Sequence, residues 1–235
     1  FSEVGAEEVT NGDFATDTGW TKGTGITISG GSANFTGNAN TFLTQSEVVS
    51  SGKTYKATFT VSNYVSGAID INLGGSTRQG NISANGTYVF YITVTSGNIL
   101  YFQEDFSNGF VGSIDNVSVK EVGQDWSFQS GATMGDGKAI ITGDGSVAGL
   151  IEQTNVFASG KSYIITLDAV INSGGGLNIK DGLGFADTFD SILTTGSYTF
   201  YYTAPSIKSL VIARKTGGTP YDSSVDNISV KEVGQ

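Results

Sequence analysis

The sequence contains neither cysteine nor histidine. Without cysteine it can form no disulfide, no thiolate metal site and no thiol nucleophile, and its redox compartment cannot be read from its residues. Without histidine it lacks the commonest general base and the commonest transition-metal ligand, which disfavours catalytic triads and zinc hydrolysis. The oxygen ligands that remain, from Asp, Glu and main-chain carbonyls, are those that suit calcium.

Proline, positive charge and long hydrophobic runs are also scarce. There are two prolines, the net charge is −10, and the longest run of basic residues is the pair Arg214-Lys215. So acidic a chain is predicted to bind no nucleic acid, and no apolar run approaches the ~18 residues of a membrane span, which predicts no membrane insertion. Glycine is abundant instead, at 34 residues, and this composition is typical of short strands joined by many tight turns.

One phrase occurs twice in the chain. It reads SIDNVSVKEVGQ at 113–124 and SVDNISVKEVGQ at 224–235, with ten of twelve positions identical. The segments that begin GWTKGTG at Gly19 and DWSFQSG at Asp125 also align without a gap, which matches Trp20 with Trp126. We therefore predict two copies of one module, residues 1–124 and 125–235, the second lacking the NGDF opening of the first.

The first five residues, FSEVG, look like a worn copy of the SVKEVG that ends each repeat. We therefore expect the chain to be a slice of a longer tandem array, with neighbouring repeats as partners.

Within each copy the apolar residues alternate with polar ones. In KTYKATFTV, the residues at 55, 57, 59 and 61 share one face, and in TYVFYITV the residues at 88, 90 and 92 do so. Gly30-Gly31 and Asp136-Gly137 are two-residue turn signals between strands. The predicted fold class is all-β, with two tandem antiparallel β-sandwich domains of jelly-roll topology.

The stretch VTNGDFATDTGWT at 9–21, followed by SGKTYKATF and a closing IDNVSV, resembles the jelly-roll carbohydrate-binding modules of families 4, 9 and 22. The chain also resembles the tandem SVKEVGQ-ending repeats of phage tail and fibre proteins. This resemblance implies a non-catalytic adhesion module, virion-borne or extracellular, that binds cell-surface or extracellular polysaccharide. In a fibre it would be a homo-oligomer such as a trimer. The alternative is a polysaccharide-binding module of a secreted bacterial glycoside hydrolase.

The repeated phrase places a carboxylate near the core edge. Val117 and Val119 share a strand face with Asp115 whereas Ile114 has the opposite parity, so we expect a bulge or a bend between Ile114 and Val117. An unpaired carboxylate there would be costly, and either calcium or hydrogen bonds from main-chain amides or neighbouring asparagines would satisfy it. The resemblance implies a structural calcium ion at these residues: Asn11, Asp13 and Asp115 in the first copy and Asp226 in the second.

The two copies differ most in the loops 103–110 and 214–224. These loops combine aromatic residues with amide and charged groups, as sugar recognition requires, although unconstrained loops also drift freely. The predicted ligand-binding residues are Gln103, Glu104, Phe106, Asn108, Phe110, Arg214, Tyr221 and Asp222. Trp20 and Trp126 occupy equivalent positions and are predicted to pack in the core or at its rim.

Two carboxylate pairs could mimic a glycosidase site, Glu104 with Asp105 and Asp187 with Asp190. Neither pair recurs in the other copy. We therefore predict that the protein is not an enzyme.

Overall fold

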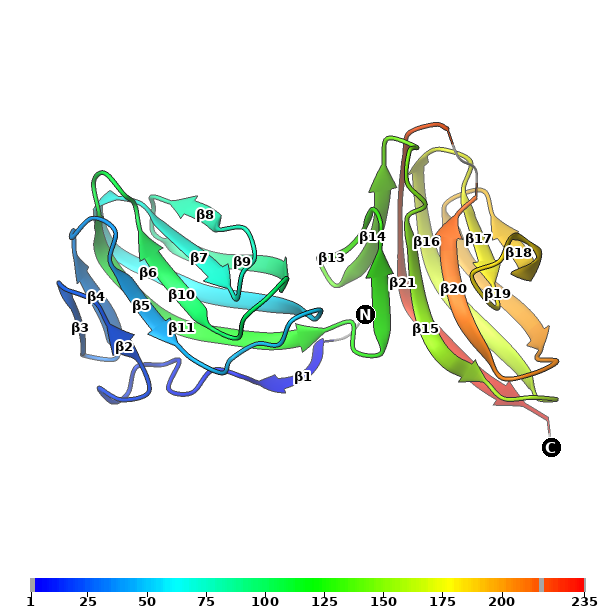
Figure 1. Ribbon diagram of the computed structural model, residues 1–235, viewed down its shortest axis with the longest axis horizontal. Coiled ribbons are helices and arrows are strands. Elements are labelled where there is room, and N and C mark those ends of the chain that lie inside the picture. The colour runs from blue at the N-terminus through cyan, green and yellow to red at the C-terminus, as the bar shows by residue number, and fades with distance from the viewer. Residues whose placement is uncertain (1–2, 216–217, 235) are drawn as a thin grey trace. The chain divides into compact units, whose positions relative to one another are not determined.

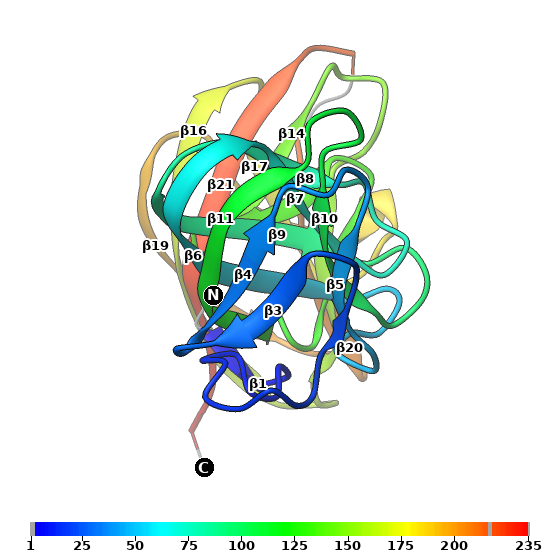
Figure 2. The same ribbon diagram turned by 90° about the vertical axis from the view of Figure 1, so that its left-hand side faces the viewer.

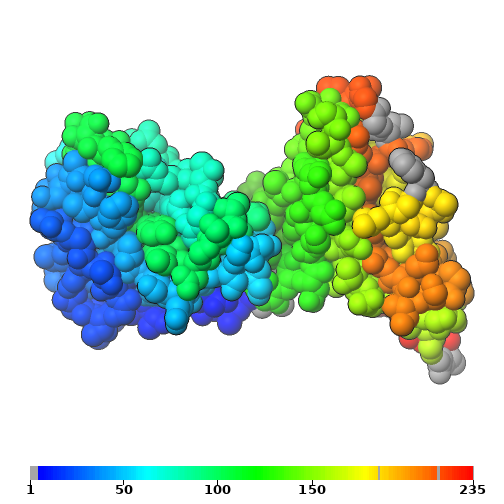
Figure 3. All heavy atoms as spheres, in the orientation of Figure 1, coloured from blue at the N-terminus to red at the C-terminus, as the bar shows by residue number. Residues whose placement is uncertain are grey.

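Figure 1 shows a computed structural model, which describes residues 3–215 and 218–234. The chain divides into two compact units, Glu3–Val122 and a second that begins at Gly123, here called the first and second modules. Figure 3 colours the first from blue to green and the second from green to red. Among the described residues the one helix is a short 3-10 turn, Phe185–Asp187, and no helix there could cross a membrane.

The first module consists of two antiparallel sheets (Figures 1 and 2). The strands of one sheet, in spatial order, are β3 (Ile26–Ser29), β4 (Ser32–Thr36), β11 (Phe110–Val122), β6 (Thr54–Gly67) and β9 (Gly86–Thr93), with β1 (Glu3–Glu7) also paired to β11. The strands of the other are β2 (Thr21–Lys22), β5 (Phe42–Gln45), β10 (Leu100–Glu104), β7 (Ile69–Leu73) and β8 (Gln79–Ile82).

The second module repeats this arrangement. The first of its sheets contains β13 (Ala132–Gly135), β14 (Lys138–Gly143), β21 (Tyr221–Val233), β16 (Ser162–Ser173) and β19 (Gly196–Thr203). Its other sheet contains β12 (Trp126–Gln129), β15 (Leu150–Phe157), β20 (Lys208–Arg214), β17 (Leu177–Lys180) and β18 (Thr188–Ile192). No strand of this module in the described residues corresponds to β1.

The strand order identifies both modules as jelly rolls. Let the eight strands of the first module from β4 to β11 be numbered one to eight in chain order. Their spatial order is then 1-8-3-6 in one sheet and 2-7-4-5 in the other. In the second module, the strands from β14 to β21 follow the same order. Each domain therefore has the antiparallel jelly-roll sandwich that the sequence predicted.

Strand alternation builds the two cores. In β6, Tyr55, Ala57, Phe59 and Val61 are buried, whereas the intervening residues face outward, as predicted. Separate clusters of buried side chains fill the first and the second module. At about 25 cal/mol per Å² of apolar surface removed from water, burial of these faces is the main force that holds the sheets together.

Both predicted hairpins are confirmed. Ser29 pairs with Ser32 across Gly30-Gly31, and Gly135 pairs with Lys138 across Asp136-Gly137. All four turn residues have positive φ, between 51° and 75°, which matches the right-handed twist of the flanking strands.

The expected bulge lies in the repeated phrase. Asp115 pairs with Thr60 and Ser118 pairs with Thr58. An advance of three residues along β11 therefore lies opposite an advance of two residues along β6. The extra residue turns Ile114, Val117 and Val119 all toward the core. The second module has the same bulge between Asp226 and Ser229 on β21.

Candidate functional site

An opening segment, residues 8–20, closes one end of the first sandwich. Its anchor is Gln45, whose Oε1 accepts a hydrogen bond from Thr10 N at 2.8 Å and whose Nε2 donates to Thr10 O at 2.8 Å. Phe14 is 1% exposed, and its ring lies 5.1 Å from that of Trp20. The Trp20 indole donates to Asn11 O at 3.0 Å, so Trp20 belongs to the core, as predicted.

The closing strand is fastened to this opening by direct hydrogen bonds. Val117 N, within the bulge, donates to Gly12 O at 2.9 Å. A Cβ on Gly12 would lie 2.0 Å from Val117 O, so only glycine permits this approach. Glu7, which sequence reasoning missed, accepts from Val119 N at 2.8 Å and from Ser118 Oγ at 2.5 Å. Main-chain and carboxylate contacts therefore already hold the two segments together.

The predicted calcium ligands have other partners here. Asn11 Oδ1 accepts from Thr16 N at 3.2 Å, and Asp13, which is exposed, accepts from Ala15 N at 3.3 Å. Asp115 accepts through both carboxylate oxygens from Asn116, at 2.6 Å from the amide N and 3.2 Å from Nδ2. A shallow groove brings Asn11 and Asp13 beside Asn116, but Asp115 does not line it.

The aspartate of the second module lies in an equivalent bulge. Asp226 Oδ1 accepts from Asn227 N at 2.7 Å, and Asn227 Nδ2 donates to Asp168 at 2.6 Å. The described residues contain no group of three or more acidic side chains that could hold a metal ion. In this arrangement hydrogen bonds satisfy the two bulge aspartates, and the calcium ion stays a prediction.

The loop 103–110 is buried near its two ends and exposed in its middle. Phe110 and Glu104 are fully buried: Phe110 packs at 5.5 Å from Phe35, and Glu104 accepts from Phe110 N at 2.7 Å and from Thr41 Oγ1 at 3.0 Å. Glu104 and Phe110 therefore serve the core and offer no surface to a ligand. Burial raises the pKa of the Glu104 carboxyl group, although these hydrogen bonds oppose the rise. Phe106 and Asn108 are exposed.

The loop 214–224 differs from its counterpart. Tyr221 is buried, and its hydroxyl accepts from Gly149 N at 3.1 Å and lies 3.3 Å from Val147 O. Arg214 stacks on the Tyr221 ring at 5.2 Å and donates to Gly145 O at 2.7 Å. Asp222 accepts from Asn172 Nδ2 at 3.1 Å. These side chains fasten the loop to the sandwich.

Another set of predicted and unpredicted residues meets on the outer face of the β5-β10-β7 sheet. Tyr101 and Gln103 alternate with the buried Leu100 and Phe102, so their side chains lie on the outer face. Each of these two residues pairs with one residue of β5 on one side and one residue of β7 on the other, which gives two rows of three side chains across the sheet. We call this surface the outer-sheet patch, and its rows are Phe42, Gln103 and Asp70, and Thr44, Tyr101 and Asn72.

The patch combines aromatic and polar groups. Phe42 is 38% exposed, and Gln103, beside it, is nearly buried and donates to Asn40 Oδ1 at 3.0 Å. Arg78 Nη1 lies 3.8 Å from Asp70 Oδ2, and its guanidinium lies 4.6 Å from the centre of the Phe106 ring. The predicted residues Gln103 and Phe106 are thus joined to a larger surface that extends along the sheet.

The equivalent face of the second module carries no aromatic side chain at the positions that match the patch. The strand registers place Leu150, Glu152, Asn178, Lys180, Val211 and Ala213 at the positions equivalent to the patch. None of these residues is aromatic, and Val211 is fully buried. Of the two modules, the first alone carries the outer-sheet patch.

Sequence reasoning missed Phe42, Tyr101, Asp70 and Asn72. The available signal was their strict alternation with buried residues in FLTQ, LYFQE and IDINL. Which of the outward residues share a row depends on strand register, which joins segments up to about 60 residues apart.

No protein-family model and no curated protein matches the chain. Among solved structures, the tandem CBM22-1–CBM22-2 domain of Xyn10C from Paenibacillus barcinonensis is 12% identical with a TM-score of 0.39, covering 99% of both chains. A fucolectin from Morone saxatilis serum is 11% identical with a TM-score of 0.29, covering 87% of this chain and 86% of that one. All these TM-scores are below 0.5, and the fold of each module rests on its own strand order.

Proposed function

We propose that the first module binds a glycan on the outer-sheet patch and that the chain is a non-catalytic adhesion module. The observation that carries this proposal is the pair of cross-strand rows built around Tyr101 and Gln103. Aromatic faces pack against the C–H surfaces of sugar rings, while amide, carboxylate and guanidinium groups bind the hydroxyls. The patch offers both kinds of group on a rigid sheet.

The setting that we propose is a virion fibre, tail or decoration protein that binds host-surface polysaccharide outside the cell. An open sheet face has few enclosing walls, so affinity per site should be weak, and copies arrayed along a fibre would raise it through effective concentration. A polysaccharide-binding module of a secreted glycoside hydrolase would use the same patch. The two settings predict different neighbours in the full-length protein, a virion-anchoring domain or a catalytic one.

Tyr101→Ala tests the site. The matched control is Tyr91→Ala, which removes a similarly half-buried tyrosine from β9 in the other sheet of the same module. We expect a glycan array to reveal ligands for the wild-type chain. Titration with the best ligand should then show about tenfold weaker binding by Tyr101→Ala, typical of the loss of an aromatic anchor, and unchanged binding by Tyr91→Ala.

A wild-type chain that binds nothing on the array would overturn the proposal. So would equal loss of binding in the two tyrosine variants, because that result would place the ligand away from the patch.

A further inference from the structure

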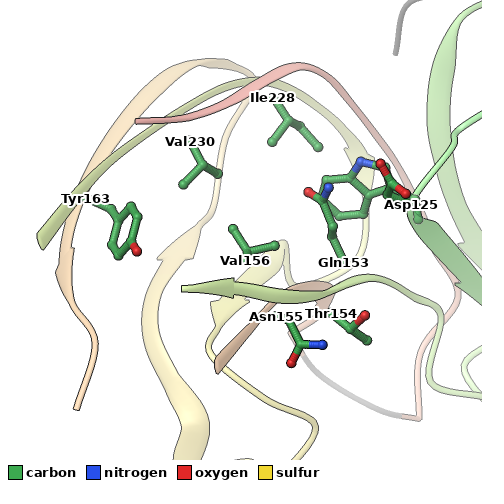
Figure 4. A pocket seen from close by; sticks show the side chains of 9 residues that line it. Asp125, Gln153, Thr154, Asn155, Val156, Tyr163, Ile228 and Val230 are labelled. Carbon is green, nitrogen blue, oxygen red and sulfur yellow. The ribbon is translucent and has the colours of Figure 1, made fainter. Parts of the chain in front are cut away.

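A groove of about 640 Å³ is present at one end of the second module (Figure 4). Ile228 and Val230 of β21 face Val156 and Gln153 of β15 across it. Every residue that lines this groove belongs to the second module, and the full lining is Asp125, Trp126, Gln153, Thr154, Asn155, Val156, Tyr163, Ile228 and Val230.

The groove occupies the place that the opening segment fills in the first module. In the first module Leu100 pairs with Gln45, and in the second Leu210 pairs with Gln153, which makes the two glutamines equivalent. Trp126 is followed by Ser127, which pairs with Glu152, the residue before Gln153. In the same way Trp20 is followed by Thr21, which pairs with Thr44, the residue before Gln45. The second module thus keeps the residues that dock an opening segment but contains no such segment, because Trp126 follows almost directly on the previous phrase.

The missing cover leaves apolar residues open. Val48, Val117 and Val119 of the first module are at most 5% exposed. Their equivalents in the second module, Val156, Ile228 and Val230, are all partly exposed. Residues that form the floor of a core in one module therefore line a groove in the other.

Main-chain and amide groups are open as well. The Gln153 side chain forms no hydrogen bond to any residue that the structure describes, whereas Gln45 binds both polar groups of Thr10. Beyond Val225, the described part of β21 pairs with β16 alone. The matching part of β11 pairs also with β1, with Glu7 opposite Lys120. An exposed strand edge is a template for an added strand.

We propose that this groove binds an extended peptide segment supplied by another polypeptide, with the chemistry of residues 3–18 of this chain. The segment adds a strand along residues 231–233 of β21, whose one strand partner among the described residues is β16, and pairs its main chain with the Gln153 amide, as Thr10 does with Gln45. An aromatic side chain of the segment packs against Trp126, as Phe14 packs against Trp20. The first module shows that the equivalent residues hold a peptide.

A synthetic peptide of residues 3–18 tests this binding in the full chain. The peptide ends before Gly19 because Trp126 already takes the place of Trp20. The equivalent site of the first module is filled by its own segment, so calorimetry should detect one peptide per chain. We expect about tenfold weaker binding by Gln153→Ala, since two hydrogen bonds are lost, and a similar loss for a Phe14→Ala peptide.

The control variant is Tyr201→Ala, which removes a tyrosine 74% exposed on β19, in the same sheet as β21 but away from the groove lining. It should bind the peptide as the wild type does. The Gln153 side chain has no hydrogen-bond partner to lose in the described part of the chain, so its substitution should leave the fold intact, and circular dichroism checks this. Gln153→Glu adds a second variant that can accept from a peptide N–H but cannot donate.

Three outcomes overturn the proposal: no binding at about 1 mM peptide, a thousandfold above a micromolar Kd; equal binding by wild type, Gln153→Ala and Gln153→Glu; or equal binding of the Phe14→Ala peptide. Soluble oligosaccharide that perturbs the Gln153 side-chain amide signals in NMR, where the peptide does not, would assign the groove to a glycan instead.

Discussion

Gln45 binds Thr10 as a neighbouring strand would, accepting from its N–H and donating to its C=O, both at 2.8 Å. A third hydrogen bond from Nε2 reaches Gly19 O at 3.0 Å. One side chain therefore ties both ends of the opening segment to β5. The equivalent Gln153 makes no such contact with the residues that the structure describes, which provides a natural comparison between the modules.

Gln45→Leu should destabilise the first module by about 2–3 kcal/mol, because it removes the three hydrogen bonds that tie the opening segment to β5. Gln153→Leu should change the stability of the second module by less than about 0.5 kcal/mol. Each module contains one tryptophan, so urea unfolding followed by fluorescence in Trp126→Phe and Trp20→Phe backgrounds reports each separately. Equal effects of the two leucine substitutions would contradict this account of the opening segment.

The bulge asparagines should differ in importance. Asn116 and Asn227 both have φ of 52°, a left-handed conformation that alanine adopts at a cost of about 1 kcal/mol. Asn227→Ala should cost more than Asn116→Ala, because the Asn227 side chain donates to Asp168 on β16 and holds the pKa of that carboxyl group below its usual value, whereas the Asn116 side chain donates to the adjacent Asp115. Denaturant midpoints measure both, and Asn116→Gly, which adopts positive φ freely, should be close to neutral.

Glu104 should give the first module a distinctive pH dependence. Its folded-state pKa is raised, so between that value and the usual ~4.3 the folded chain retains a proton that the unfolded chain has lost. The unfolding free energy of the wild type, measured relative to Glu104→Gln, should therefore rise as pH falls through this window. A difference between the two proteins that is independent of pH from 4 to 8 would show that Glu104 does not titrate as burial predicts.

Calcium should have little effect on stability. The carboxylate oxygens of Asp115 already accept hydrogen bonds from Asn116, and Glu7 already fastens the closing strand. An ion present at 100 times its Kd would stabilise the folded state by about 2.7 kcal/mol, which is a shift of several degrees in Tm. We expect calorimetry in calcium and in EDTA to agree within about 1 °C, and a larger rise with calcium would support the metal site that the sequence predicted.

Much of the fold could be predicted from the sequence because its determinants are local. Alternation in KTYKATFTV sets which face of β6 is buried, and Gly30-Gly31 and Asp136-Gly137 set two turns. The parity conflict between Ile114 and Val117 was sufficient to predict the bulge. Each of these signals depends on residues within one strand or one turn.

The predicted ligand residues show where such reasoning fails. Phe110 and Glu104 look like binding residues in the string QEDFSNGF, yet they are buried, because the flanking strands β10 and β11 turn these two side chains toward the core. Tyr101 and Phe42 lie on one surface because β5 and β10 are neighbours in a single register, a contact between distant segments.

The sequence by itself determined the duplication, the strand periodicity, the turns and the bulge, since these follow from identity and from side-chain parity. Only the tertiary structure decided which outward residues form one patch and that the second module lacks a segment that the first supplies for itself. Those features depend on strand order and register, which are set by the packing of two whole sheets around a shared core.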